Sequence, residues 1–239
     1  MNTLWPQLTQ RANIGLSAAQ GELLSRYLEL LLAANERMNL TRISDRAVAE
    51  IQHIGDALTL LPHLPSGAHT LADVGTGGGV PGIPLAIVRP DVKVTLIEST
   101  KKKAAFLRET IAQLELTNVT VDDRRAELVG AVGSKSREAF DLVVVRAVAT
   151  MIWLVEWCLP LAKPKGRMLA MKGPKGREEL TVVTRRTLRM LGASDHEPLV
   201  HAVELANTDA RIIVQIDKNT HTDRRFPRDP TAAKGNPIT

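Results

Sequence analysis

The stretch Leu71-Ala-Asp-Val-Gly-Thr-Gly-Gly-Gly79 decides how this chain can fold. It starts as a short apolar run, typical of a buried strand, and ends in a turn where Gly75, Gly77 and Gly79 alternate. Glycine lets the backbone turn sharply and approach a ligand where a Cβ atom would clash. A helix is expected next, from Pro81 to about residue 88. A strand, such a loop and a helix form the nucleotide-binding half of an α/β fold.

Two classes of nucleotide cofactor fit this loop. Gly77-Gly-Gly-Val-Pro-Gly82 satisfies the G-x-G-x-x-G dinucleotide fingerprint, which is a weak signal by itself. Asp73-Val-Gly-Thr-Gly-Gly-Gly79 satisfies instead the acid-x-G-x-G-x-G pattern typical of S-adenosylmethionine-dependent methyltransferases. Asp73 favours the second class, because its carboxylate can hold the loop through backbone N–H groups and face the ammonium of a methionine moiety, whereas it would repel a pyrophosphate. An ordinary strand-to-helix turn is the alternative without a ligand.

Glu98 is the second candidate cofactor residue. It ends the alternating, β-branched run Val92-Lys-Val-Thr-Leu-Ile97, which predicts the second strand. An acid at this place can accept hydrogen bonds from both ribose hydroxyls of an adenosine. Because NAD enzymes and methyltransferases both use such an acid, Glu98 indicates a nucleoside without naming the cofactor. Its alternative role is an N-terminal charge for the next helix, where Thr100 is the expected cap.

Composition limits the class of protein. The 239 residues suffice for one large α/β domain with an appended segment. No apolar stretch of membrane-spanning length and no signal-peptide pattern is present, so we expect a cytoplasmic protein without contact to a membrane. The single Cys158 excludes a disulfide framework and a Cys-based metal site. A net charge of +5 suggests a polyanionic partner such as nucleic acid. Separately, we expect the protein to be a monomer.

The sequence divides into three segments. Residues 1–65 are predicted to be helical, with Ser17 and Gln20 as a capping box for a helix over 17–36 and a second helix over 45–61. Residues 66–217 are predicted to form the methyltransferase domain. Residues 218–239 contain three prolines and no apolar period, which predicts a basic, disordered tail.

Strands and helices alternate after residue 66, which predicts a Rossmann-like α/β fold. One long helix is expected over 175–191. The strand-like runs 198–205 and 210–217 have no long helix between them and should therefore pair antiparallel. We expect a seven-stranded, mostly parallel sheet with an antiparallel edge strand.

Ligands of open α/β sheets bind at the carboxyl ends of the strands. The strand over 119–122 is followed by Ala126 and Glu127, an acidic position that could meet the exocyclic amine of an adenine. Trp157 lies on the helix expected after the fourth strand and is predicted to be part of the core.

Two further strands end in cations. Arg146 ends the strand over 140–145, and Lys172 ends the strand over 167–172. Neither cation suits the vicinity of a sulfonium unless an RNA phosphate or an acid such as Asp56 neutralises it. For Arg146 a structural ion pair is as good an interpretation as substrate contact, whereas Lys172, followed by glycine, favours substrate contact. His53 and Asp56 share one helical face, and a lone histidine with an acid nearby more often forms a satisfied surface pair than a catalytic one.

The order of these motifs resembles that of the bacterial small-subunit ribosomal RNA guanine-N7 methyltransferases, also called glucose-inhibited division protein B. The resemblance spans about residues 20–205 and departs at Val80, where the family usually has a larger apolar residue. The segments that carry it are Asn39-Leu-Thr41, His53-Ile-Gly-Asp56, Asp73 to Leu85, Lys101-Lys-Lys103, Phe106-Leu-Arg108, Arg125-Ala-Glu127, Arg146-Ala-Val148 and Lys172-Gly173.

The resemblance implies S-adenosyl-L-methionine as cofactor and a guanine of 16S ribosomal RNA as acceptor, within the assembled or assembling 30S subunit. The family's cofactor positions correspond here to Gly75, Val80, Ala126, Glu127 and Arg146. The spacing arguments add Asp73, Gly77 and Glu98. No metal is implied.

If guanine N7 is the acceptor, its free lone pair carries no proton, so in-line transfer needs no general base. Catalysis can then come mostly from positioning, which supplies ~7–11 kcal/mol in favourable cases. We expect Arg146 and Lys172 to hold the RNA backbone or the guanine O6 edge, and Asp56 to offset the charge of the product ring. A small-molecule methyltransferase, an NAD-dependent oxidoreductase and a nucleotide-sensing module remain alternatives.

Overall fold

The computed structural model describes residues 4–238, except 66, 68, 147, 206, 207 and 234. Its centre is a seven-stranded sheet with the order β3-β2-β1-β4-β5-β7-β6. The five parallel strands are β1 (Thr70–Val74), β2 (Lys93–Ile97), β3 (Val119–Asp122), β4 (Phe140–Arg146) and β5 (Ala162–Lys172). The last two strands, β6 (Leu199–Val203) and β7 (Arg211–Asp217), pair antiparallel. The predicted fold class is confirmed.

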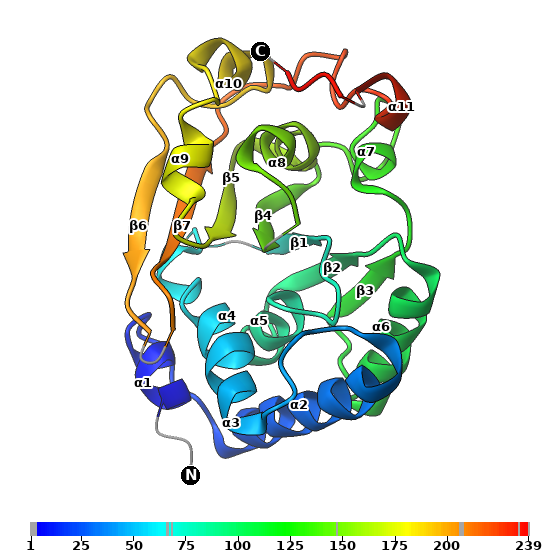
Figure 1. Ribbon diagram of the computed structural model, residues 1–239, viewed down its shortest axis with the longest axis vertical. Coiled ribbons are helices and arrows are strands. Elements are labelled where there is room, and N and C mark those ends of the chain that lie inside the picture. The colour runs from blue at the N-terminus through cyan, green and yellow to red at the C-terminus, as the bar shows by residue number, and fades with distance from the viewer. Residues whose placement is uncertain are drawn as a thin grey trace.

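Helices cover both faces of the sheet (Figure 1). One layer contains α1 (Leu4–Gln10), α2 (Ala18–Met38), α3 (Arg46–Ala49), α4 (Asp56–Leu58), α5 (Gly82–Val88) and α6 (Lys101–Gln113). The other contains α7 (Ala126–Val129), α8 (Met151–Cys158), α9 (Gly176–Leu180), α10 (Arg185–Met190) and α11 (Pro230–Ala233).

Alternation along the central strands explains these two layers. In β4, Leu142 and Val144 belong to the hydrophobic cluster on the first face, whereas Val143 and Val145 belong to the cluster on the second. Successive side chains of a strand point to opposite faces, so a continuous apolar run needs cover on both sides. The buried central strands therefore require both helical layers.

The N-terminal helices pack into the first of these clusters. The predicted capping box is present, with Gln20 N donating to Ser17 Oγ at 3.2 Å and Ser17 N donating to Gln20 Oε1 at 3.0 Å. The helix predicted over 45–61 is instead composite: α3, a π-helical turn over Glu50–Gly55, α4 and a 3₁₀ turn over Leu61–His63. π-Helical turns are rare and often occur at functional sites. The division at residue 65 stays a prediction.

The antiparallel hairpin at the end of the sheet is confirmed, and the later strand is the inner one. β7 pairs with β5, and β6 forms the edge. Because β7 runs opposite to β5, its first residue, Arg211, lies near the carboxyl end of β5, where Lys172 pairs with Ile212. The single helix expected over 175–191 was wrong: α10 is separate and starts at its own cap, Thr184, whose side chain accepts a hydrogen bond from Thr187 N.

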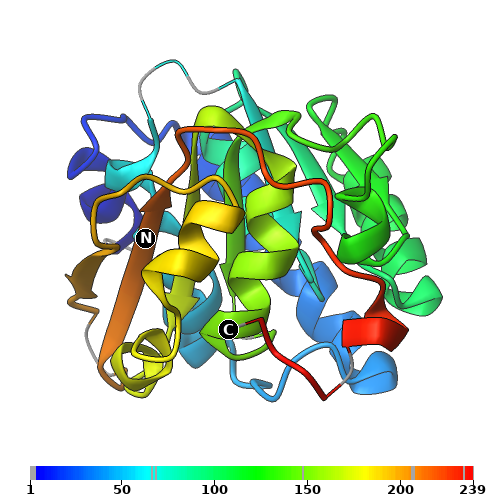
Figure 2. The ribbon, with the colours of Figure 1, turned by 90° about the horizontal axis from the view of Figure 1, so that it is seen from above.

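The tail was predicted to be disordered, and this prediction is wrong for the part of it that the structure describes. Figure 2 shows it running from β7 across the face that carries α8 to α10. Phe226 and Ile238 are buried in the second hydrophobic cluster. Arg137 donates hydrogen bonds to the carbonyl oxygens of Phe226 at 2.6 Å and Thr222 at 2.9 Å. Composition missed this packing because few apolar residues and distant charged partners hold the segment.

Lys218 is the anchor of the tail. Its side chain is 0% exposed, and its Nζ donates at 2.8 Å to Glu138 Oε1. Leu159 O, Ala162 O and Thr222 Oγ1 also lie 2.8 Å from the same ammonium, whose three N–H groups are shared among the four acceptors. Burial lowers the pKa of Lys218 to about 8, against the opposing effect of Glu138. Four acceptors around one ammonium fix where the tail begins.

We expect Lys218→Met to lower the free energy of unfolding by about 3 kcal/mol or more, because it removes the cation paired with Glu138 and the shared donor of three further acceptors. Urea denaturation followed by circular dichroism measures the loss. Lys135→Met, at an exposed lysine, is the control and should stay near the parent value. Equal stability of the two variants would contradict the packed tail.

Candidate active site

A cavity of about 370 Å³ opens at the carboxyl edge of the sheet. Six of the predicted site residues line it: Gly75, Gly77, Glu98, Ala126, Glu127 and Arg146. They come from the ends of β1, β2 and β4 and from the start of α7, which follows β3. This is the place where open α/β sheets bind their ligands.

The glycine loop after β1 forms one wall. Gly75 and Gly77 have φ values of 65° and 60°, in the left-handed region that favours glycine. A Cβ atom on Gly75 would lie 2.6 Å from Val148 Cγ2. A Cβ atom on Gly77 would have no heavy atom within 4 Å, so it would stand in open space beside the cavity. Gly77 therefore leaves room for a ligand that approaches the backbone.

Asp73 holds the loop from inside the sheet. Its Oδ2 accepts hydrogen bonds from Thr76 Oγ1 at 2.5 Å and from Gly82 N at 2.7 Å, on the two sides of the turn. Its Oδ1 is buried and has no hydrogen-bond partner among the described residues. Burial raises the pKa of Asp73 from 3.8 to about 6, although both hydrogen bonds oppose the shift. The bond to Gly82 N is the predicted loop-holding contact, whereas a role toward the cofactor stays a prediction.

Glu98 connects the loop to the second strand. Its Oε2 accepts from Gly77 N at 3.1 Å, and its Oε1 accepts from Thr100 N at 2.8 Å, at the start of α6. Glu98 thus also supports that helix, as its alternative role predicted. A carboxylate has about four lone-pair sites, so both oxygens can still accept a hydroxyl from the cavity that Glu98 lines.

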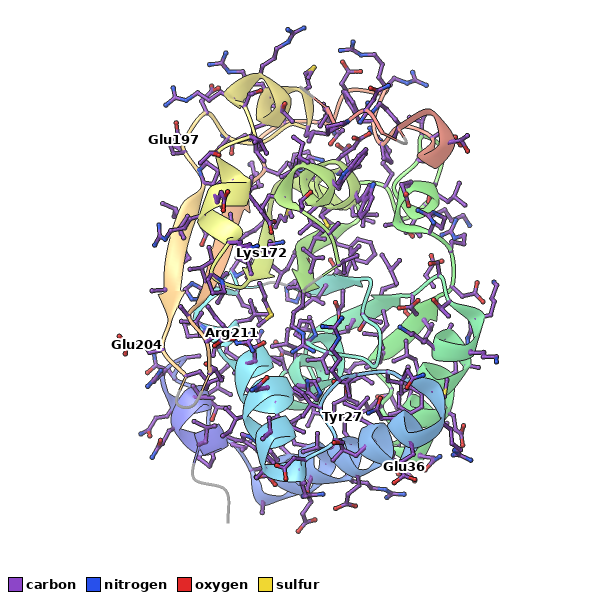
Figure 3. The ribbon with its side chains drawn as sticks, in the orientation of Figure 1. Tyr27, Glu36, Lys172, Glu197, Glu204 and Arg211 are labelled. Atoms are coloured by element: carbon purple, nitrogen blue, oxygen red, sulfur yellow. The ribbon has the colours of Figure 1, made fainter. Side chains whose placement is uncertain are left out.

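The helix α2 supports the loop from the other side, and sequence reasoning missed this contact. Tyr27 Oη donates a hydrogen bond to Gly78 O at 2.9 Å, and Tyr27 lies in the interior (Figure 3). Leu31 lies against the same glycine, where a Cβ atom would be 2.5 Å from Leu31 Cδ1. The only signal in the sequence is that the single tyrosine of the chain lies on the apolar face of its helix.

Eight lining residues were not among the predicted site residues, and Lys103 and Trp157 are the two with the clearest chemical consequence. Lys103, at the start of α6, borders the cavity and was noted only as part of a lysine run. Trp157 was predicted to be core, but it is only partly buried and borders the cavity beside Ala126 and Glu127. It offers a flat apolar wall at the place where an adenine was expected. Glu127 itself accepts a hydrogen bond from Arg125 Nη2 at 2.9 Å.

Arg146 is bound by the π-helical turn of the N-terminal segment. Its Nη1 donates to Gln52 O at 2.9 Å and to Asp56 Oδ2 at 3.3 Å, and its Nη2 lies 3.4 Å from His53 Nδ1. The structural ion pair considered for Arg146 therefore exists, and Arg146 still lines the cavity. Burial, followed by the charge of Arg146, lowers the pKa of His53 to about 4, so the ring is neutral at pH 7. His53 Nε2 lies 3.0 Å from Thr41 Oγ1.

Four predicted site residues lie outside the lining of this cavity. Asp73 and Asp56 are buried behind it, and Val80 is part of the hydrophobic core. Lys172 is 8% exposed; its Nζ lies 2.6 Å from Glu179 Oε2 and donates to Ala149 O at 2.8 Å (Figure 3). The ammonium of Lys172 is thus paired with a glutamate on the next helix, α9, and the residues at the strand ends could not predict this pairing. The roles of Val80 and Lys172 stay predictions.

The residues present fit S-adenosylmethionine. The open space at Gly77 admits a group close to the backbone, and the carboxylate of Glu98 is available to ribose hydroxyls. The unpartnered Oδ1 of Asp73 adds negative potential beneath the loop, which suits a cationic ligand better than a pyrophosphate. Among the described residues, no group of three or more potential metal ligands is found. Nor does any described helix combine the length and apolar character that a membrane crossing requires.

Asp73→Asn separates the loop-holding role from the electrostatic one. The asparagine oxygen can accept both hydrogen bonds that Oδ2 accepts now, so the loop should keep its shape. We expect an unfolding free energy equal to or above that of the parent at pH 7.5, but a Kd for S-adenosylmethionine at least tenfold higher by calorimetry. Unchanged affinity would reject a role of the Asp73 charge in cofactor binding.

The pH dependence of stability is the internal control for this variant. The folded pKa of Asp73, about 6, lies above its ordinary value of 3.8, so the folded protein binds more protons than the unfolded chain between these pH values. The contribution of Asp73 to stability is therefore lost as pH rises from about 4 to 6. The free energy of unfolding of Asp73→Asn should therefore rise relative to that of the parent as the pH increases from about 4 to 6.

Known proteins are similar to this chain in sequence. The family described as GidB, rRNA small subunit methyltransferase G, matches residues 20–204. "Ribosomal RNA small subunit methyltransferase G" of Leuconostoc mesenteroides is 40% identical over 230 residues, which are 95% of each chain. The protein of the same name from Sorangium cellulosum is 48% identical over 170 residues, 70% of each chain.

Solved structures share the fold at low sequence identity. A SAM-dependent methyltransferase from Aquifex aeolicus matches with a TM-score of 0.51 at 20% identity, over 74% of this chain and 96% of that one. Precorrin-6y C5,15-methyltransferase from Geobacter metallireducens matches with a TM-score of 0.51 at 15% identity, over 69% and 87%. The chain therefore has the class I methyltransferase fold and belongs to the GidB family, rRNA small subunit methyltransferase G.

Proposed function

We propose that this protein transfers a methyl group from S-adenosyl-L-methionine to N7 of a guanine in 16S ribosomal RNA, as a cytoplasmic monomer acting on the assembled or assembling 30S subunit. The observation that carries the proposal is that one cavity is lined both by the carboxylate of Glu98, which is expected to bind a nucleoside, and by the cation of Arg146. The names of the relatives support the RNA substrate.

The chain's own residues would mainly bind and orient. S-adenosylmethionine supplies an activated methyl group on its sulfonium. Guanine N7 has a free lone pair, so no proton has to be removed before the transfer. The side chains near the cavity are consistent with a transfer that needs no general base. His53 faces Arg146 and Thr41, and Glu98 holds the loop and α6. Positioning would then supply most of the rate enhancement.

Asp56 makes Arg146 compatible with a cationic cofactor. An unpaired guanidinium beside the cavity would repel a sulfonium, and the buried carboxylate of Asp56 lies 3.3 Å from Arg146 Nη1. The same carboxylate would offset the positive charge that the guanine ring acquires on methylation. Arg146 keeps N–H donors for an RNA phosphate or the guanine O6.

Two alternative functions have less support. A small-molecule methyltransferase needs an enclosed apolar pocket, whereas this cavity is bordered by charged side chains: Glu98, Lys103, Arg124, Arg125, Glu127 and Arg146. An NAD-dependent oxidoreductase, or a nucleotide-sensing module, would bring a pyrophosphate close to buried Asp73. Calorimetry with S-adenosylmethionine and with NAD separates these classes by the ligand that binds.

Deletion of the gene should remove one N7-methylguanosine from small-subunit ribosomal RNA. Borohydride and aniline treatment cleaves RNA at this nucleotide, and primer extension then maps the position. Complementation with the intact gene is the control and should restore the cleavage. An identical map with and without the gene would refute the proposed function.

Arg146→Ala and Lys172→Ala test the two predicted substrate cations. We expect both to reduce methyl transfer to unmethylated small subunits at least a hundredfold. The Kd for S-adenosylmethionine should change little in Lys172→Ala, because Lys172 lies outside the lining of the cavity. Glu179→Gln, which frees Lys172 from its ion pair, is the companion variant and should retain transfer. Near-normal transfer by Lys172→Ala would reject its substrate role and leave it a structural partner of Glu179.

A further inference from the structure

Two arginines from different strands share one buried carboxylate at the carboxyl edge of the sheet. Arg146 ends β4, and Arg211 begins β7. The Nη1 atoms of these arginines lie 3.3 Å and 3.7 Å from the same oxygen, Oδ2 of Asp56. The side chain of Asp56 is 2% exposed, so its carboxylate is shielded from solvent and is held beside these two arginines. Sequence reasoning considered Arg146 and Asp56 but gave Arg211 no role.

The charges of this cluster do not balance. No second carboxylate of the described residues lies within 4 Å of either guanidinium, which leaves two cations on one anion. The neighbouring His53 is neutral at pH 7 because burial and both arginines lower its pKa to about 4. Lys172, at the end of the strand between β4 and β7, is paired with Glu179 and does not compete with the two arginines for Asp56. Asp73 also acts electrostatically on Arg146, but it lies buried beneath the loop and forms no ion pair with either arginine. Among the groups in direct contact the net charge is therefore about +1, which a bound anion would neutralise.

Arg211 also has hydrogen-bond donors to spare. Its Nε is buried without a partner among the described residues, and its side chain remains 26% exposed (Figure 3). A guanidinium carries five N–H donors, and among the described residues the guanidinium of Arg211 has one ion-pair partner, Asp56, at 3.7 Å. Arg146, by comparison, contacts Gln52, Asp56 and His53. A polar group held this incompletely in the folded protein calls for an explanation, and a ligand supplies one.

The position of the cluster indicates which ligand it takes. Glu98 and Glu127, the acids expected to bind adenosine, follow β2 and β3, on one side of β1 in the strand order. Arg146 and Arg211 belong to β4 and β7, on the other side of β1. The cationic cluster thus begins at the cavity and extends away from the adenosine end, toward where an acceptor would lie.

We propose that Arg146 and Arg211, held by Asp56, form a site for one phosphate of the RNA backbone next to the acceptor guanine. The planar fork of arginine matches the oxygens of a phosphate and holds it in a fixed orientation. This assignment rests on the proposed RNA substrate and adds a backbone contact that fixes the register of the guanine against the cofactor.

Arg211→Gln tests the site, and Arg167→Gln is its matched control. Arg167 lies on β5 at the opposite edge of the sheet and is 25% exposed, compared with 26% for Arg211; it too is paired with an aspartate, Asp217, at 2.6 Å. Methyl transfer from radiolabelled S-adenosylmethionine is measured on small ribosomal subunits from a strain without the gene, over a range of salt concentrations. Calorimetry gives the Kd for S-adenosylmethionine, and thermal melting reports folding.

For Arg211→Gln we expect kcat/KM to fall roughly tenfold through KM for the subunit, as the loss of one charge-assisted hydrogen bond implies. The log–log salt slope should become less steep by about 0.7, the value for one phosphate contact with single-stranded RNA. The Kd for S-adenosylmethionine should stay within about twofold of the parent value. Arg167→Gln should match the parent in kcat/KM, in the salt slope and in this Kd. Arg211→Lys keeps the charge near Asp56 but loses the planar fork. It should therefore recover most of the salt slope and still show a raised KM for the subunit, and this raised KM is the test if Arg211→Gln does not fold.

Two results would overturn the assignment. If Arg211→Gln weakens S-adenosylmethionine binding as strongly as it weakens methyl transfer, the anion is the cofactor's carboxylate. If Arg211→Gln and Arg211→Lys both behave like Arg167→Gln, no phosphate binds there. Failure of the unsubstituted protein to methylate the subunit would instead refute the proposed function, and the phosphate site with it.

Discussion

The buried carboxylate of Asp73 is the interaction on which the site depends. One of its oxygens accepts hydrogen bonds from Thr76 and Gly82, which lie on the two sides of the glycine turn. A buried charge is costly, and these two bonds offset part of that cost. With the turn fixed in this way, the N–H of Gly77 meets Glu98, and the first two strands are joined at their carboxyl ends.

The N-terminal helices complete this site instead of forming a separate attachment. Tyr27 binds the carbonyl of Gly78 from beneath the loop, and the helices share one hydrophobic cluster with β1. The π-helical turn brings His53 to Arg146, and Asp56 follows directly after it. Because the loop and Arg146 both rest on residues before 65, loss of this segment would disturb the cofactor cavity and the cationic cluster together.

Charge is separated along the carboxyl edge of the sheet. The acids Glu98 and Glu127 lie toward β2 and β3, and the arginines lie toward β4 and β7. Lys172 lies between the arginines in strand order, but Glu179 neutralises it. A nucleoside with free hydroxyls fits the first side, and a polyanion fits the second. The two sides of this sheet edge therefore differ in charge, as the proposed cofactor and RNA substrate would require.

The sequence by itself determined the fold class, the mostly parallel sheet with its antiparallel hairpin, and six residues of the cavity. These follow from local rules: the period of apolar residues, the glycine turn and the rule that ligands bind at strand ends. Only the tertiary structure decided which charged side chains are paired with an opposite charge and which remain available to a ligand. Asp56 for Arg211 and Glu138 for Lys218 are partners far apart in sequence, and Glu179 reaches Lys172 from the next helix, so all three pairings depend on how helices and strands pack. The same reason explains why the tail, polar in composition, is held by buried hydrogen bonds that no local pattern predicts.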